Sequence, residues 1–363
     1  MRTPGSVLLA AGGTGGHILP AAVFGGWINE RHPAVKVRYL SGRRPVELEI
    51  YRSLKIEPLV VDASGSPFGA PRGEGLARCK DMLSSVWQAS GYVRRDPPGL
   101  CVAFGGYVSA AAVFSSFMLR IPVVAHEQNA LAGKVTRLAG MLGARVASGW
   151  ERCDPLQRGS FAPVGVPVRR LRGMSREAAA GELLSGLRLT DGPVVAVMTG
   201  SLGSGNLAGI IGQVSRLSEF STWNFLVIDP GVEWPSAALN VTRLPRSWDI
   251  APLINLADIL VTRGGASTLA EAQASGIPTV VVPWRRASGD HQMKNALEMA
   301  KSGGAEIFDE TAGDVFDLAA KLTNLRRRCP PAEKDIGKKM YNASTSTCER
   351  LWYFCCAFLE GRD

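Results

Sequence analysis

Short apolar segments alternate along the chain with longer segments in which apolar residues recur every three or four positions. The short segments are rich in Val, Ile and Leu, which is typical of parallel strands buried on both faces, and the longer ones are typical of helices that cover such a sheet. The predicted strands are residues 7–11, 35–40, 59–62, 100–104, 122–125, 145–148, 194–199, 225–228, 258–262 and 279–283. The pattern therefore predicts an α/β fold.

The alternation runs through the chain twice, and each half opens with a strand that leads into a glycine-rich turn and a helix. Residues 7–17 (VLLAAGGTGGH) open the first half, and residues 194–205 (VVAVMTGSLGSG) open the second. Two Rossmann-like domains that face each other across a cleft are the simplest architecture with this pattern. Ligands of such sheets bind at the carboxyl ends of the strands, so we expect the active site in that cleft.

The boundary between the two halves is predicted near residues 163–167 (PVGVP), where two prolines and a glycine interrupt the pattern. The residues that precede the prolines are held extended there. We expect an N-terminal domain over residues 1–165 and a C-terminal domain over residues 166–340. Residues 341–363 are expected to form a C-terminal helix that packs back towards the N-terminal domain.

The composition narrows the classes of protein. The chain of 363 residues is 46% hydrophobic and 20% charged, which excludes a disordered protein. Its formal net charge of +9 favours anionic partners such as phosphorylated metabolites, nucleic acid or an acidic membrane surface. The seven cysteines show no Cys-x-x-Cys spacing, which favours reduced thiols in a cytoplasmic protein over a zinc site. The apolar segments 6–11 and 351–359 are too short for a signal-peptide core and a membrane span.

Two glycine turns in the first half form a candidate phosphate site. Residues 12–16 (GGTGG) follow a strand and precede a helix, whose N-terminal N–H groups suit a phosphate. The turn lacks the dinucleotide spacing and the Walker lysine, and a tight turn for helix packing explains it equally well when it is taken alone. Residues 104–109 (FGGYVS) supply a second such turn in the same half. The two turns are therefore expected to lie side by side and to hold a pyrophosphate together.

Histidines and their polar neighbours give the candidate general bases. A polar cluster directly follows the strand near residue 124 and consists of His126, Glu127, Gln128 and Asn129. Only four histidines occur, and His17, His126 and His291 all fall at strand-to-helix turns or helix starts. This placement favours a catalytic or sugar-binding role for at least one of them over helix capping. We take His17 as the leading candidate, with Glu127 and His126 as alternatives.

The second half carries groups suited to a nucleotide sugar. Ser201 lies in the glycine turn that opens this half, and Arg263 ends a strand before a second turn. A planar guanidinium suits a diphosphate, and the carboxylate of Glu271 further along the helix can accept both hydroxyls of a ribose. Residues 289–296 begin a helix with several hydrogen-bonding side chains, as a sugar needs. No Asp-x-Asp occurs, so we expect no metal to be held by a simple carboxylate pair.

Taken together, these segments resemble the peptidoglycan N-acetylglucosaminyltransferases of glycosyltransferase family 28, which have the GT-B fold. The matching segments are GGTGGH at 12–17, FGGYVS at 104–109, IPVVAHEQNA at 121–130, GVPVR at 165–169, RGGASTLAE at 263–271 and DHQMKNA at 290–296. Their order and spacing make the match specific. The chain departs from the family pattern at four positions, with Val166 for Asn, Thr199 for Gly, Leu202 for Gln and His291 for Gln.

The resemblance implies an enzyme of peptidoglycan synthesis, and hence of cell wall biogenesis, cell shape and cell division. It would transfer N-acetylglucosamine from UDP-N-acetylglucosamine (UDP-GlcNAc) to the C4 hydroxyl of MurNAc in undecaprenyl-pyrophosphoryl-MurNAc-pentapeptide (lipid I). The products would be lipid II and UDP, formed by a single inverting displacement. No cofactor is implied.

The resemblance also implies which residues bind each substrate. The acceptor-binding residues are Gly12, Gly13, Gly105, Gly106 and Tyr107. The donor-binding residues are Ser201, Arg263, Glu271, His291, Gln292, Thr14, Gly15, Gly16, Asn129, Arg169 and Ile250. Gly15, Gly16 and Asn129 match acceptor-side positions as well. His17 matches the candidate general base, and Glu127 is the second catalytic candidate.

A basic and apolar patch is the candidate membrane contact. It consists of Arg78, Lys80, Arg94 and Arg95 around Leu76, Met82, Leu83, Val86 and Trp87, with residues 117–120 nearby. Such a patch suits anionic lipid, although an amphipathic helix packed on the sheet is the ordinary alternative. The lipid-linked acceptor favours docking, so we expect a peripheral protein on the cytoplasmic side of the bacterial cell membrane.

Three other functions remain open at this point. A glycosyltransferase with a diacylglycerol acceptor would share the fold and the donor half, but the paired glycine turns favour a pyrophosphate. A protein that binds nucleotide sugars without turnover would share the same motifs. A nucleic-acid binder is suggested by the charge alone, and since no motif interleaves aromatic and basic residues we expect no such partner.

Overall fold

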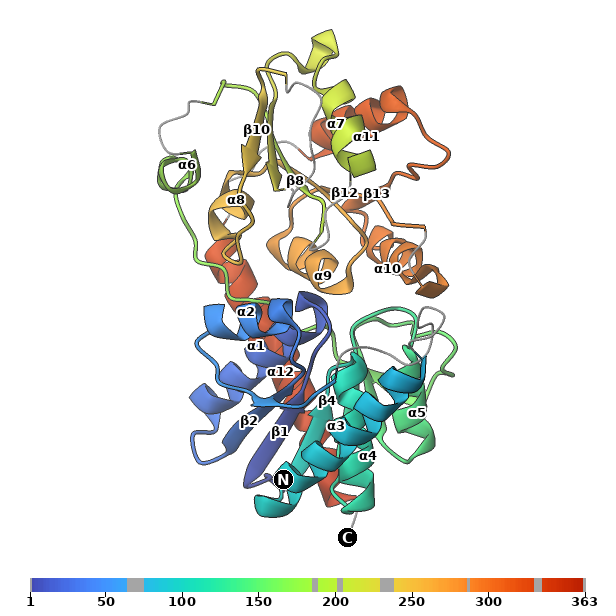
Figure 1. The fold of residues 1–363 in the computed structure, drawn as a ribbon. Helices are drawn as coiled ribbons and strands as arrows, with labels where there is room; N and C mark the ends of the chain where they lie inside the picture. Colours follow the sequence, from blue (N-terminus) through green and yellow to red (C-terminus); the bar gives the residue numbers. More distant parts are fainter. Residues whose placement is uncertain are drawn as a thin grey trace. The chain divides into compact units, whose positions relative to one another are not determined.

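The computed structural model describes residues 2–63, 75–184, 189–200, 205–228, 238–285, 288–329 and 335–361. The chain divides into two compact units. Unit 1 consists of Met1–Arg169 and Ser344–Asp363, and unit 2 consists of Arg170–Ala343. Each unit contains a sheet of parallel strands connected by helices (Figure 1), which confirms the predicted fold class. The predicted boundaries at residues 165 and 340 lie a few residues before those of the units.

Unit 1 contains a seven-stranded sheet in the order β3-β2-β1-β4-β5-β6-β7. Its strands are β1 (Ser6–Ala10), β2 (Lys36–Ser41), β3 (Leu59–Val60), β4 (Leu100–Ala103), β5 (Val123–Glu127), β6 (Arg145–Ser148) and β7 (Phe161–Pro163). Its helices are α1 (Gly15–Arg31), α2 (Pro45–Ser53), α3 (Gly75–Arg95), α4 (Tyr107–Met118) and α5 (Lys134–Met141). All neighbouring strands pair in parallel.

The sheet of unit 1 is buried on both faces because its central strands are apolar throughout. Leu8 and Ala10 of β1 pack in a core with residues of α3, α4 and α5. On the opposite face, Phe24 of α1 packs against Phe104, which directly follows β4. The helices that follow β1 and β4 thus lie on opposite faces of the sheet. This reversal between two adjacent strands creates the crevice in which ligands of such sheets bind.

The last helix, α12 (Ile336–Glu360), supplies residues to both units. In unit 1 its Trp352 stacks on His32 with ring centroids 4.5 Å apart. The Nε atom of Arg350 donates a hydrogen bond of 2.9 Å to the carbonyl of Val164. These contacts fix the end of the chain against α1 and against the segment that follows β7.

Unit 2 contains a six-stranded parallel sheet in the order β10-β9-β8-β11-β12-β13. Its strands are β8 (Val194–Met198), β9 (Asn224–Ile228), β10 (Val241–Leu244), β11 (Ile259–Thr262), β12 (Thr279–Val281) and β13 (Ala305–Ile307). Its helices are α6 (Arg176–Leu184), α7 (Gly205–Val214), α8 (Ala251–Leu256), α9 (Ala266–Ser275), α10 (His291–Ala300) and α11 (Val315–Arg328), with 3-10 turns at Ser218–Phe220 and Ser288–Asp290.

Every predicted strand overlaps an observed one, whereas β7, β10 and β13 are not predicted. These three occupy three of the four sheet edges. An edge strand pairs on one side only and needs no continuous apolar segment. β10 accordingly alternates (VTRL), β13 contains Glu306 and β7 ends at Pro163, so none of them carries the apolar pattern of a central strand.

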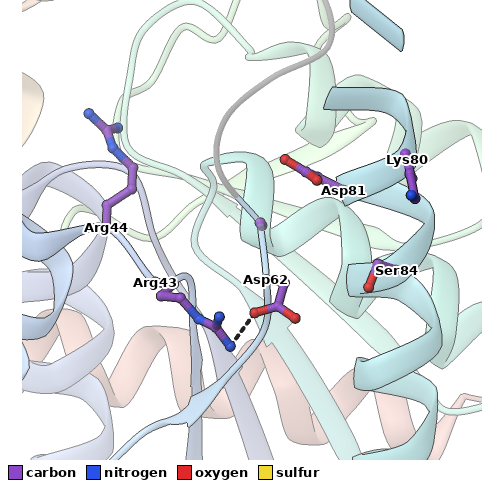
Figure 2. Close-up of a pocket in the computed structure, with 7 residues that line it drawn as sticks. Arg43, Arg44, Asp62, Lys80, Asp81 and Ser84 are labelled. Atoms are coloured by element: carbon purple, nitrogen blue, oxygen red, sulfur yellow. Dashed lines mark ion pairs between the residues drawn. The ribbon is translucent and has the colours of Figure 1, made fainter. Parts of the chain in front are cut away.

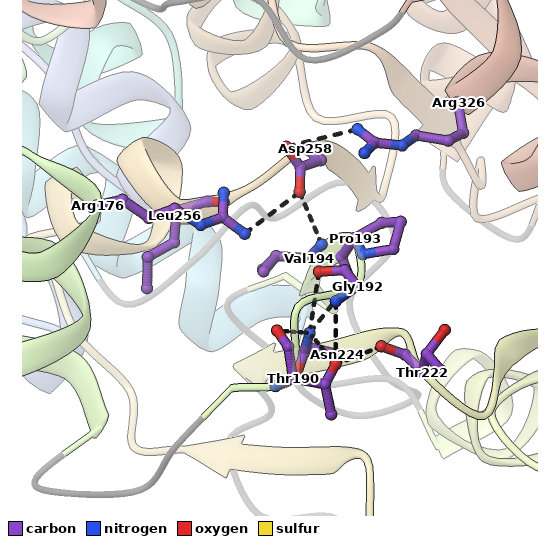
Figure 3. A network of polar contacts seen from close by, with 10 residues as sticks. All are labelled: Arg176, Thr190, Gly192, Pro193, Val194, Thr222, Asn224, Leu256, Asp258 and Arg326. Atoms are coloured by element: carbon purple, nitrogen blue, oxygen red, sulfur yellow. Dashed lines mark hydrogen bonds and ion pairs between the residues drawn. The ribbon is translucent and has the colours of Figure 1, made fainter.

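Two buried polar side chains tie together the amino ends of the central strands of unit 2 (Figure 3). The carboxylate of Asp258 accepts a 2.8 Å hydrogen bond from the backbone N–H of Val194 and faces Arg176 and Arg326. The amide of Asn224 accepts a 2.9 Å hydrogen bond from the N–H of Thr190 and donates one of 2.9 Å to its hydroxyl. The segment before β8 is therefore held by the first residue of β9 and by the residue before β11.

Removing the amide of Asn224 should destabilise unit 2. Asn224→Ala leaves the N–H of Thr190 without its partner, and such a loss costs about 1–3 kcal/mol of unfolding free energy. Urea unfolding followed by tryptophan fluorescence measures this loss. Asn342→Ala, at an exposed position of α12, is the matched control and should change the unfolding free energy by less than about 0.5 kcal/mol. Equal unfolding midpoints for the two variants would contradict the role of Asn224.

Candidate active site

The two glycine turns of unit 1 meet at the crevice between β1 and β4. Gly106 has φ 77°, and a Cβ atom at this position would collide with the carbonyl group of Gly12. A Cβ added to Gly13, which has φ 91°, would lie 3.9 Å from the Cα of Gly106. Only glycine allows this approach of two backbones. The prediction that the two turns lie side by side is confirmed.

Two helices begin at this contact, α1 after Thr14 and α4 after Gly106. The N-terminus of a helix carries partial positive charge, so the pair favours an anion at the crevice. Within the turns, the N–H of Gly13 donates to Glu47, and that of Gly105 donates to the hydroxyl of Ser109 at 3.0 Å. The capacity to bind an anion therefore rests with the two helix starts and not with these two glycine N–H groups.

Glu47, in the first turn of α2, holds both turns in place and is not predicted by the sequence analysis. Its side chain is fully buried. The carboxylate accepts hydrogen bonds from the N–H of Gly13, from the N–H of Arg44 at 3.0 Å and from the hydroxyl of Tyr107 at 2.8 Å. Burial and the neighbouring Glu47 carboxylate raise the pKa of Tyr107 far above its usual value, so the phenol stays protonated and donates. In sequence, Glu47 resembles an ordinary exposed residue of a helix start.

A pocket of about 490 Å³ lies between α3 and the segments that follow β2 and β3 (Figure 2). It is lined by Arg43, Arg44, Asp62, Ala63, Lys80, Asp81 and Ser84. Arg43 forms an ion pair with Asp62, whereas the Arg44 guanidinium donates a 3.3 Å hydrogen bond to the carbonyl of Gly13. Arg44 therefore places a positive charge next to the crevice.

His17, in the first turn of α1, faces the crevice and is half-buried. Its Nδ1 lies 2.9 Å from the Oε1 of Gln128. The alternative base, His126, is fully buried, and both of its ring nitrogens are occupied: Nε2 lies 2.8 Å from the carbonyl oxygen of Gly165, and Nδ1 lies 2.9 Å from the amide nitrogen of Gln128. Burial lowers the pKa of His126 to about 4. His17 is therefore the better placed base of the two.

The carboxylate of Glu127, the second catalytic candidate, is buried and satisfied by its own loop. It accepts hydrogen bonds from the N–H and side-chain amide of Asn129 at 3.0 Å each, from the N–H of Gly133 at 2.8 Å and from the hydroxyl of Thr136 at 2.6 Å. Four donors occupy the lone pairs of both carboxylate oxygens. This arrangement favours a structural role for Glu127, which shapes the loop between β5 and α5, over the expected catalytic one. Asn129 belongs to the same loop.

In unit 2, Arg263 lies at the end of β11 and is only 8% exposed. Its guanidinium forms two hydrogen bonds, of 2.8 and 3.1 Å, with the carboxylate of Glu310 and a third of 3.1 Å with the carbonyl of Val282. Arg263 thus joins the segments that follow three neighbouring strands. Arg263, the expected diphosphate contact, is thus paired with the buried carboxylate of Glu310. Glu310 is not predicted from the sequence.

Gln292 links the same turn to α10. Its Oε1 accepts hydrogen bonds from the N–H groups of Gly264 at 3.1 Å and Trp284 at 2.9 Å, while the amide of Asn295 donates to the carbonyl of Gly264 at 2.9 Å. A Cβ on Gly264 would collide with the backbone of Gln292. Within the described part of the chain, the Nε2 group of Gln292 has no partner, so it remains a donor for a ligand at this edge.

The other predicted donor residues are spread over the chain. In unit 2, Glu271 is buried in α9, His291 begins α10 and Ile250 precedes α8. In unit 1, Thr14 is exposed at the start of α1, followed by Gly15 and Gly16, and Arg169 is the last residue before unit 2. Ser201 and Leu202 lie outside the described residues. Contacts in the structure thus join Arg263 and Gln292 through the turn at Gly264.

No cluster of three or more His, Cys, Asp or Glu side chains is arranged to hold a metal ion within the described residues. In the same part of the chain, no helix has the length and apolar character that crossing a bilayer requires.

Both units match domains of one known protein family. The glycosyltransferase family 28 N-terminal domain matches residues 7–148, and the C-terminal domain of that family matches residues 195–346. A relative from Levilactobacillus brevis is 30% identical over 91% of this chain and 94% of its own length. One from Pseudomonas fluorescens is 30% identical over 95% and 94%, respectively. Both are named UDP-N-acetylglucosamine–N-acetylmuramyl-(pentapeptide) pyrophosphoryl-undecaprenol N-acetylglucosamine transferase.

Among solved structures, the fold is similar to that of Acinetobacter baumannii MurG, with a TM-score of 0.67 and 22% sequence identity. The alignment covers 98% of this chain and 99% of that one. At 22% sequence identity, this similarity supports a shared fold and nothing further.

The contact between the glycine turns can be tested by stability. Gly106→Ala places a methyl group against the backbone of Gly12 at a positive φ, and should lower the unfolding free energy by about 1–3 kcal/mol. Gly26→Ala, in α1, is the matched control because its Cβ meets open space, and it should raise the unfolding free energy by about 0.5–1 kcal/mol. Thermal unfolding of both variants measures the two effects. A neutral Gly106→Ala would mean that the turns do not touch.

Proposed function

The chain belongs to glycosyltransferase family 28, and we propose that it transfers N-acetylglucosamine from UDP-GlcNAc to undecaprenyl-pyrophosphoryl-MurNAc-pentapeptide. The products are lipid II and UDP, so the reaction is a step of peptidoglycan synthesis. The observation that carries this proposal is the match of both units, at 30% identity over nearly the whole chain, to relatives named for this transfer.

Unit 1 is assigned the acceptor because its crevice suits a pyrophosphate. The starts of α1 and α4 converge there on the contact of Gly13 with Gly106 and offer partial positive charge without a metal ion. Arg44 adds a full charge at the side of the same turn. Tyr107 and Glu47 do not contact the ligand in this proposal but fix the shape of the turns.

Unit 2 is assigned the nucleotide sugar. Gln292 offers its amide N–H groups to the sugar or the base, and His291 extends the same helix start. Glu271 accepts the ribose hydroxyls from α9. Arg263 holds the turn that carries Gly264 and contributes positive potential, which its pairing with Glu310 reduces. Ser201 remains a proposed phosphate contact.

The chemical step is an inverting displacement with His17 as the base. The Nε2 of His17 takes the proton of the acceptor C4 hydroxyl as its oxygen forms a bond to the anomeric carbon of the donor. The bond from that carbon to the diphosphate oxygen breaks, and UDP leaves with the electron pair. Attack from the face opposite UDP gives a β-1,4 linkage.

Transfer of labelled N-acetylglucosamine to a short-chain analogue of the lipid-linked acceptor tests this function. The wild type should transfer the sugar, and His17→Ala should be slower by a factor of about 10²–10⁴, which is the contribution of a general base. His32→Gln is the matched control, because His32 packs on Trp352 away from the glycine turns, and it should retain activity.

The outcomes separate the rival functions. Transfer only to diacylglycerol would replace the proposed acceptor class. Binding of UDP-GlcNAc without any transfer would indicate a nucleotide-sugar-binding protein. Full activity of His17→Ala would refute the assignment of the base while leaving the transfer itself intact.

The proposed site of membrane contact is the exposed apolar surface of α3, α4 and α5. On α3, Leu83 and Trp87 are 72% and 78% exposed, and on the neighbouring helices Phe117, Met118 and Met141 are also exposed. Large apolar side chains exposed on neighbouring helices suit an interaction surface. Met82 and Val86, by contrast, pack against the core, as expected for an amphipathic helix that covers the sheet.

Basic residues occur on the same helix α3 and directly after α4. They are Lys80, Arg94, Arg95 and, less exposed, Arg78 on α3, with Arg120 after α4. The side chain of Leu76 lies outside the described residues. Cations near an anionic surface each contribute on the order of 1 kcal/mol. This combination supports peripheral association with the cytoplasmic face of the bacterial membrane, where the lipid-linked acceptor is found.

Vesicle binding measures this association. Trp87→Glu should weaken binding of the protein to vesicles that contain anionic phosphatidylglycerol by about tenfold or more, because it removes an exposed aromatic ring and adds repulsion. Tyr353→Glu, also exposed in unit 1 but on α12, is the matched control and should bind like the wild type. Equal losses for the two variants would show that the charge change alone, and not the α3 surface, determines binding.

A further inference from the structure

A chain of hydrogen bonds connects His17 to the backbone at Gly165. His17 Nδ1 lies 2.9 Å from Gln128 Oε1, the Gln128 amide nitrogen lies 2.9 Å from His126 Nδ1, and His126 Nε2 lies 2.8 Å from the carbonyl oxygen of Gly165. Imidazole nitrogens and amide ends each have two alternative assignments. In this series of hydrogen bonds, however, the carbonyl of Gly165 determines each assignment as far as His17.

The hydrogen bond to the carbonyl of Gly165 fixes the tautomer of His126. A carbonyl oxygen only accepts hydrogen bonds, so His126 Nε2 must carry a proton. His126 is fully buried, and desolvation by burial lowers its pKa to about 4, so the ring is neutral near pH 7. A neutral imidazole carries one proton, which leaves Nδ1 of His126 as an acceptor.

The orientation of the Gln128 amide follows. Its nitrogen lies 2.9 Å from His126 Nδ1 and 2.8 Å from the backbone carbonyl of His126. Both of these atoms are acceptors, so the NH₂ group must point towards them and the oxygen towards His17. Gln128 is 2% exposed, and its backbone carbonyl also accepts a 2.8 Å hydrogen bond from the indole of Trp150, which fixes the residue on both sides.

We infer that Gln128 is a positioning residue that holds His17 in the tautomer with its proton on Nδ1. The amide oxygen accepts only, so His17 Nδ1 must donate, and Nε2 then presents a lone pair. The ring lies close to Gly105, where an added Cβ would be only 2.9 Å from its Cε1 and Nδ1 atoms. The inference rests on the proposed function in one respect, namely that Nε2 of His17 receives the proton of the acceptor hydroxyl.

The tautomer can be measured without any turnover. Nitrogen-15 spectra of the full-length enzyme with labelled histidines distinguish a protonated ring nitrogen from one with a lone pair, and His17→Gln identifies the signals of His17. The wild type is expected to show Nδ1 protonated and Nε2 unprotonated at pH values where the ring is neutral. Gln128→Met, which has similar size but no amide oxygen, should shift His17 towards the Nε2-protonated form.

Kinetics of the same variants test the consequence. Gln128→Met should lower kcat by about tenfold to a hundredfold and leave the KM for UDP-GlcNAc within about twofold of the wild type. His126→Phe is the matched variant, because its ring can pack on Phe104 and its backbone carbonyl still orients the Gln128 amide. It should keep the His17 tautomer and lose less activity than Gln128→Met.

Two results would overturn the inference: a wild-type His17 protonated on Nε2, or a Gln128→Met variant with unchanged tautomer and kcat. A loss of the tautomer in Gln128→Met together with full activity of His17→Ala would have a different meaning. It would leave the positioning by Gln128 intact and refute His17 as the base.

Discussion

The close approach of Gly106 to the backbone of Gly12 is the constraint on which unit 1 depends. The parallel neighbours β1 and β4 end side by side, and the helices that follow them lie on opposite faces of the sheet. Without a Cβ between them, the two turns touch, and the starts of α1 and α4 converge. A larger residue at position 106 would separate the helix starts, and with them the partial charges that suit a pyrophosphate.

Buried polar side chains, and not the glycines alone, keep this arrangement rigid. Glu47 binds the first turn to Tyr107 of the second, Glu127 shapes the loop after β5, and Gln128 orients His17. In unit 2 the pairs Arg263–Glu310 and Gln292–Gly264 do the same for neighbouring loops. A buried polar group costs free energy unless it is fully satisfied, so each of these contacts selects one loop conformation.

The sequence predicts those features that local pattern determines. Central strands such as β4 are continuous apolar segments, and glycine turns are visible as motifs, so the fold class, the central strands and the placement of the two turns follow from sequence. Glu47 and Glu310 could not be predicted, because their partners lie far along the chain and only tertiary packing makes them buried. For the same reason Glu127 looks like a catalytic carboxylate in sequence, although its loop occupies it in the structure.

The buried Glu47 carboxylate presents an electrostatic difficulty beside a site for a pyrophosphate, since like charges repel more strongly where water is excluded. The structure reduces this repulsion in two ways. Hydrogen bonds from Gly13, Tyr107 and the backbone of Arg44 stabilise the charge of Glu47, and the Arg44 guanidinium, bonded to the Gly13 carbonyl, adds a positive charge beside the same turn. The carboxylate thus orients the turn while the nearest full positive charge remains at the surface, accessible to the ligand. At His17 the orienting residue is Gln128, whose amide is neutral. It fixes the imidazole without adding a second negative charge next to an anionic substrate.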